Sequence, residues 1–80
     1  MWIKSQDKKE LVKVIRVYTS RIFGDKKGKY ILWGQFSGTN LFGENKTTLG
    51  IYPTEERLQE ELALIESALK ENPEGFYEMR

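Results

Sequence analysis

The junction at Pro53 and Thr54 constrains the fold of this chain more than any other feature, because a strand pattern stops there and a helix pattern starts. Pro53 cannot donate to a strand ladder, and the Thr54 hydroxyl can accept a hydrogen bond from an amide in the first helical turn. Apolar residues in the segment 55–71 then recur at the spacing of a core-facing helix. They are Leu58, Leu62, Ile65 and Leu69. The junction therefore predicts one amphipathic helix over residues 55–71, packed against a sheet.

The other regular segments have the composition of strands. Strands are predicted over residues 2–5, 29–36 and 47–52, with a short strand or ordered tail over residues 76–79. Residues 11–23 are ambiguous, since Asp7 and Glu10 resemble a capping box and apolar residues also recur there at helical spacing. β-branched and aromatic side chains dominate this segment, and they crowd a helix but suit a sheet. We therefore predict a strand, with a bulge where Val14 and Ile15 adjoin.

The predicted fold class is α+β: an antiparallel sheet of about four to five strands, with one amphipathic helix from the C-terminal half packed on one face. Eighty residues form a single domain, residues 1–80, with a small core. A chain of this size gains stability from a second copy, so we expect a homo-oligomer, a dimer or higher. Leu64 and Ala68 widen the apolar arc of the helix and are predicted interface residues. Gly50 is the third, because a glycine in a strand marks a bulge or a close approach by another element.

Composition restricts the chemistry that the chain can perform. It has no cysteine and no histidine, which removes thiolate metal sites, the commonest zinc ligand and the commonest general base. We predict a protein that is not an enzyme and has no cofactor or metal. The net charge of +1 does not favour strong binding to duplex DNA. No stretch is apolar enough for a signal peptide or a membrane span, so we predict a cytoplasmic protein with no membrane partner.

A set of aromatic rings and arginines is the candidate ligand site, because rings stack on planar ligands and guanidinium groups pair with phosphates. The set consists of Arg16, Tyr18, Arg21, Trp33, Phe36, Phe42 and Arg57. Phe36 and Phe42 bound a polar, glycine-containing segment, which either folds back to bury the rings or forms a pocket for a nucleotide-like ligand or a protein partner. The basic residues before residue 30 also suit weak binding of single-stranded nucleic acid, with an affinity that falls as salt rises.

Three segments of the sequence carry a resemblance to a known group. They are residues 1–7 (MWIKSQD), 49–57 (LGIYPTEER) and 77–79 (YEM). Together they resemble a group of small uncharacterised proteins of Firmicutes and their phages. The resemblance implies a sheet with one packed helix, a phage or prophage association, a place in the host cell cytoplasm, and no catalytic residues. By analogy with small phage proteins, the predicted function is an anti-defence factor that sequesters a nucleotide-derived immune signal. The alternative is a protein-binding inhibitor or adaptor that acts through the helix face or residues 36–46.

Overall fold

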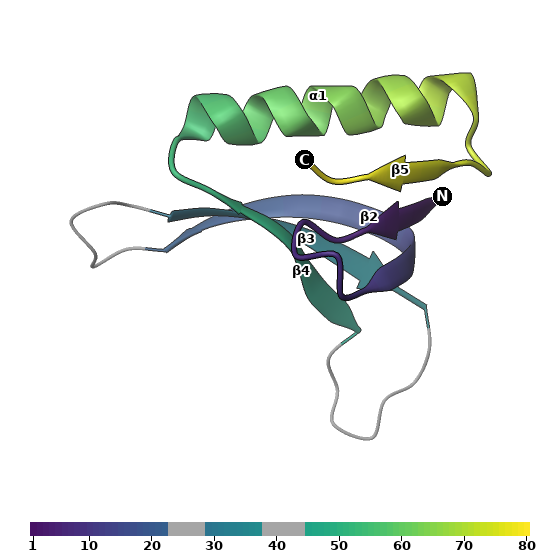
Figure 1. Ribbon diagram of the computed structural model, residues 1–80, viewed down its shortest axis with the longest axis horizontal. Coiled ribbons are helices and arrows are strands. Elements are labelled where there is room, and N and C mark those ends of the chain that lie inside the picture. Colours follow the sequence, from purple (N-terminus) through teal and green to yellow (C-terminus); the bar gives the residue numbers. More distant parts are fainter. Residues whose placement is uncertain (23–28, 38–44) are drawn as a thin grey trace.

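The computed structural model describes residues 1–22, 29–37 and 45–80. The elements are β1 (Trp2–Lys4), β2 (Leu11–Ile22), β3 (Lys29–Phe36), β4 (Lys46–Tyr52), α1 (Glu55–Glu71) and β5 (Phe76–Glu78). The strands form one sheet in the order β4-β3-β2-β1-β5, and α1 lies along one side of it (Figure 1). The predicted α+β class, a sheet with one helix from the C-terminal half, is confirmed.

The sheet is antiparallel except at one edge. β1 with β2, β2 with β3, and β3 with β4 pair antiparallel, whereas β5 pairs parallel with β1. α1 carries the chain from the β4 edge to the opposite edge, where β5 joins β1 in the same direction. The sequence did not predict this parallel pair, because a three-residue strand gives no signal of its direction.

Residues 11–22 form a strand, as their β-branched composition predicted, and not the helix that the spacing of their apolar residues also allowed. The register between β2 and β3 shifts between Val14 and Arg16, which confirms the predicted bulge. The extra residue, Ile15, is 64% exposed. Composition decided the structure here because branched side chains lose little freedom in a sheet.

The helix begins and ends as the sequence predicted. The Thr54 hydroxyl accepts a hydrogen bond from the Arg57 amide at 3.1 Å, which makes Thr54 the N-cap. At the other end the Asn72 amide donates to the Ala68 carbonyl at 3.0 Å. Within the described residues, no helix combines the length and the apolar character needed to cross a bilayer.

The core lies between α1 and the sheet and draws on most elements. Its buried members are Ile3, Leu32, Leu49, Tyr52, Leu58, Ile65 and Met79. Of the predicted helix stripe, Leu58 and Ile65 are buried, Leu62 packs against the cluster, and Leu69 is 45% exposed. The helix therefore faces the sheet with its middle turns.

Gln6, in the turn after β1, forms hydrogen bonds with the outer edge of β4. The Gln6 amide donates to the Leu49 carbonyl at 2.7 Å, and the Gln6 side-chain oxygen accepts from the Ile51 amide at 2.8 Å. On the other side of this turn, the Met79 amide donates to the Lys4 carbonyl at 3.0 Å. The three segments that carry the resemblance therefore meet in one hydrogen-bonded region. This region joins the turn after β1 to β4, and the end of β1 to the residues after β5.

Ser5 and Asp7 shape this turn. The Ser5 side chain is buried, and its hydroxyl donates to the Asp7 carboxylate at 2.6 Å while accepting from the Glu10 amide at 3.1 Å. The Lys9 amide also donates to Asp7, at 3.0 Å. The Ser5 hydrogen bond, followed by the Lys9 one, lowers the pKa of the Asp7 carboxyl. The Ser-Gln-Asp sequence is therefore explained by the turn that it builds.

Candidate functional site

The sheet face turned away from α1 can be assigned from the alternation of β3. Leu32 and Gly34 are buried on the helix side, so Trp33 between them points to the opposite face. Residues directly opposed in antiparallel strands share a face, and Tyr18 and Thr48 are both opposed to Trp33. Figure 1 shows α1 on one side of the sheet only. We call the other side the open face.

Four side chains gather there, and we call Arg16, Tyr18, Trp33 and Lys46 the open-face cluster. The rings of Tyr18 and Trp33 stack with centroids 6.4 Å apart and an interplanar angle of 17°. The Arg16 guanidinium carbon lies 4.9 Å from the Tyr18 ring centroid, and the Lys46 Nζ lies 4.9 Å from that of Trp33. The Trp33 indole N–H donates to the Ser20 hydroxyl at 2.7 Å, which orients the indole.

The register of the sheet produces this cluster. Arg16 and Lys46 are both opposed to Gln35, one row along from the row that holds the two rings. Each cation therefore extends over a ring in the neighbouring row. A cation–π attraction of this kind contributes about 0.5–1 kcal/mol at an exposed site. The rings are half-buried, whereas both cationic side chains are exposed. The cluster therefore offers two half-buried stacking surfaces and two exposed charges.

The structure separates the other predicted ligand residues from this cluster. Arg21 lies over Tyr30 at 5.4 Å, and its opposition to Tyr30 sets both on the helix side of the sheet. Phe36 lines a hollow of about 430 Å³ near the start of β2. Arg57 pairs with Glu60 at 2.6 Å on the first turns of α1. Phe42 lies outside the described residues.

Sequence reasoning missed Lys46. The predicted strand starts at residue 47, whereas β4 begins at Lys46 itself. A hairpin register between residues 29–36 and 46–52 would have identified it, since that register sets Lys46 opposite Gln35. The sequence does not state that register, because the segment between the two strands has no short turn motif.

The predicted interface residues lie in two places. On the helix, Leu64 is 38% exposed and Ala68 is half-buried. Gly50 is buried, and the group close to it is the Tyr52 ring of the same chain. The register of β4 also shifts beside Gly50, which confirms the predicted bulge. The group that approaches Gly50 belongs to the same strand and not to another element.

Replacing Gly50 by alanine is expected to lower the free energy of unfolding by about 1–3 kcal/mol, the usual cost of overpacking. The added methyl carbon would lie 2.8 Å from the Tyr52 phenol oxygen and 3.0 Å from a ring carbon. Urea denaturation measures the change. In a Tyr52→Phe background, which lacks the nearest oxygen, the same substitution should cost less. Equal costs in the two backgrounds would contradict this reading of the contact.

A second polar cluster lies between α1 and β5, around Glu61. Glu61 is fully buried. Its Oε1 accepts from the Tyr77 hydroxyl at 2.6 Å and from the Arg80 amide at 3.1 Å, and its Oε2 accepts from Arg80 Nε at 3.1 Å. The Arg80 side chain is 55% exposed, so the ion pair has one end in solvent. This network fastens the residues after β5 to the helix and is best understood as structural.

The two tyrosines next to Glu61 have raised pKa values. Burial, followed by the charge of Glu61, raises the pKa of Tyr52 to about 12. Burial and the hydrogen bond to Glu61 raise the pKa of Tyr77 well above its usual value. Both hydroxyls are therefore neutral donors over the physiological pH range.

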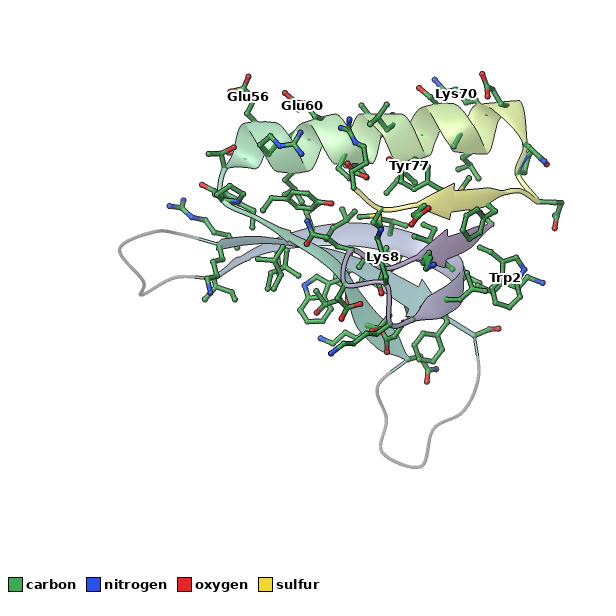
Figure 2. The ribbon with its side chains drawn as sticks, in the orientation of Figure 1. Trp2, Lys8, Glu56, Glu60, Lys70 and Tyr77 are labelled. Atoms are coloured by element: carbon green, nitrogen blue, oxygen red, sulfur yellow. The ribbon has the colours of Figure 1, made fainter. Side chains whose placement is uncertain are left out.

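An exposed apolar group lies at the β1–β5 end of the sheet. Trp2, Leu11 and Phe76 are 43%, 57% and 57% exposed, and they line a hollow of about 400 Å³. Trp2 and Phe76 are neighbours on adjacent strands. Figure 2 shows Trp2 extending away from the body of the molecule.

Charge is distributed unequally over the two sides of the molecule. The outer side of α1 is acidic, and Figure 2 shows Glu56 and Glu60 directed away from the sheet. The exposed acids of the helix are Glu55, Glu56, Glu60, Glu66 and Glu71. The open-face cluster, in contrast, presents the cations Arg16 and Lys46.

Comparisons with protein-family models, with curated proteins and with solved structures found no match for this chain. Its function is therefore inferred from the geometry of the described residues.

Proposed function

We propose that this protein is a non-enzymatic binding protein whose open face holds a nucleotide-derived ligand. The observation that carries the proposal is the stacked pair of Tyr18 and Trp33 with a cation over each ring. A base has a flat π-face, and stacking on an aromatic side chain contributes about 1–3 kcal/mol per base. Arg16 and Lys46 are long and exposed, so they can turn from the rings to the phosphates of a bound nucleotide.

The distribution of charge supports an anionic ligand on this side of the molecule. The acidic outer side of α1 repels phosphates, whereas the cations of the open face attract them. In the phage setting that the sequence resemblance implies, such binding would sequester a nucleotide-derived immune signal in the host cytoplasm.

Calorimetric titration with cyclic dinucleotides, with cyclic ADP-ribose isomers and with a single-stranded oligonucleotide tests the proposal. We expect at least one of these ligands to bind, and Trp33→Ala to weaken that binding about tenfold or more, since it removes one stacking surface. Binding to the oligonucleotide alone would replace signal sequestration by single-strand recognition on the same face. Silence of all three ligand classes would overturn the proposed function.

Trp2→Phe is the matched control, because the chain holds only two tryptophans and Trp2 lies outside the cluster. This variant should bind as the parent does, and its remaining indole fluorescence reports on Trp33 alone. Arg16→Gln and Lys46→Gln should each weaken binding and reduce its dependence on salt.

The exposed apolar group of Trp2, Leu11 and Phe76 favours a second candidate function, the binding of a protein partner by an inhibitor or adaptor. Exposed apolar patches on small proteins often mark such contacts. Pull-down from host lysate separates the two functions. A partner that is lost with Phe76→Ser but kept with Trp33→Ala would support the second candidate, and the reverse pattern would exclude it.

A further inference from the structure

Within the part of the chain that the structure describes, the second half of β2 has a neighbouring strand on one side only. β1 pairs with residues Leu11 to Lys13 of β2, and the Val14 amide adds a last bond to the Met1 carbonyl at 3.0 Å. Beyond that point, β3 is the only strand that pairs with β2 among the described residues. We call the backbone of residues 15–20, on the side away from β3, the β2 edge. An unpaired edge of this kind is a template for another strand.

The helix leaves the β2 edge accessible. α1 packs on β3, β4 and β5. Between the β2 edge and α1 runs a groove of about 340 Å³, lined by apolar side chains that include Val17 from the strand and Leu62 from the helix. Ile15 and Leu69 also line this groove, and both are largely exposed. A strand added at the edge would cover this apolar surface.

The sequence of the β2 edge favours pairing. Residues 15–20 read Ile-Arg-Val-Tyr-Thr-Ser, with no glycine, proline, lysine or acidic residue. Natural sheets protect free edges with such residues, with other charges or with bulges, and here the protection consists of Arg16 and the bulge before it. The outer edge of β4 is protected, because Gln6 forms hydrogen bonds with it at two positions. The β2 edge thus has strong β-formers and little protection.

We infer that a second copy of this chain pairs its β2 antiparallel with the β2 edge about a two-fold axis, with Tyr18 opposite Tyr18. A two-fold axis makes one segment complementary to itself. In this register Arg16, the only charge in the segment, faces the neutral Ser20 of the other copy. A register centred on Arg16 would instead oppose two like charges.

The register centred on Tyr18 also favours a second copy over an unrelated strand. Aromatic residues opposed across antiparallel strands attract each other, and Tyr18 already stacks on Trp33 within each copy. The pair would therefore place four rings in a row on one continuous open face. This interface is separate from Leu64 and Ala68, and it does not depend on the ligand proposed above.

Sedimentation equilibrium of the parent chain, Ser20→Lys and Ser20→Glu tests the inference. Both variants lose the Ser20 hydroxyl, and they place opposite charges facing Arg16 of the other copy. The parent should be a dimer, Ser20→Lys should weaken it about tenfold, and Ser20→Glu should tighten it. A monomeric parent, or equal shifts in the two variants, would overturn the inference.

Disulfide trapping gives a second measurement that does not depend on the folding of the charge variants. The chain has no cysteine, so a single Tyr18→Cys forms a covalent dimer rapidly only if the two positions meet. The control is Ser67→Cys, at an exposed position on α1. Under mild oxidation Tyr18→Cys should cross-link at least tenfold faster than Ser67→Cys. Equal rates would contradict the proposed pairing.

Discussion

Replacing Glu61 by alanine is expected to lower the free energy of unfolding by about 3 kcal/mol, the largest effect of a single substitution that we predict for this chain. The variant leaves the Tyr77 hydroxyl without its partner in the protein interior, and an unsatisfied buried donor costs about 1–3 kcal/mol. It also removes the acceptor of the Arg80 amide and leaves a void at a fully buried site. Urea denaturation at neutral pH measures the loss.

Glu60 provides a control one residue away. It is exposed and pairs with Arg57 on the surface of the helix. Exposed pairs contribute about 0–1 kcal/mol, so Glu60→Ala should change stability by no more than about 0.5 kcal/mol. Glu61→Gln, which keeps the shape and removes the charge, should fall between the two alanine variants. Equal losses for Glu60→Ala and Glu61→Ala would show that the buried network does not stabilise the fold.

The protein is expected to lose stability steeply as pH rises from about 10 to 12. Tyr52 is 2% exposed, and its pKa in the fold is about 12 against 10.0 for a free tyrosine. A raised folded pKa means that the folded state keeps its proton while the unfolded state releases it. The stabilisation is therefore complete below pH 10 and is lost as pH rises through the folded pKa. Tyr52 alone accounts for about 2 kcal/mol by pH 12, and Tyr77 adds to the loss in the same direction.

Tyr77→Phe separates this effect from the titration of other groups. The variant is less stable than the parent at neutral pH, since it removes a donor from buried Glu61. Its stability should nevertheless fall less between pH 10 and pH 12, because one of the two titrating hydroxyls is gone. Urea midpoints recorded at intervals from pH 8 to pH 12 test this. Parallel curves for the parent and the variant would show that Tyr77 plays no part in the alkaline transition.

Local signals predicted much of the fold. Pro53 and Thr54 fixed the start of α1, because strand termination and N-capping act within a few residues of the chain. The β-branched composition of residues 11–23 and the adjacent apolar pair at Val14 and Ile15 predicted a strand with a bulge, and the structure shows both over residues 11–22, residue 23 lying outside the described residues. These features depend on neighbours in the sequence, so a single sequence contains the information.

Features that depend on distant pairings could not be predicted in this way. Glu61 is buried because Tyr77 and Arg80, 16 and 19 residues away, supply its hydrogen bonds, and a glutamate beside an apolar stripe normally reads as exposed. The same limit applies to the candidate site. Arg21 lies on the side of the sheet opposite the open-face cluster, and Lys46 belongs to the cluster although the sequence did not indicate it. Only the register of β2, β3 and β4 decides which side of the sheet each residue occupies.

The two tryptophan indole N–H signals in a ¹H–¹⁵N NMR spectrum test the central proposal most directly. One comes from Trp33, whose N–H donates to Ser20 within the open face, and the other from Trp2 at the far end of the sheet. On addition of the nucleotide ligand that binds in calorimetry, the Trp33 signal should shift with increasing ligand while the Trp2 signal stays in place. A shift of the Trp2 signal with an unchanged Trp33 signal would place the ligand away from the open-face cluster and contradict the proposed site.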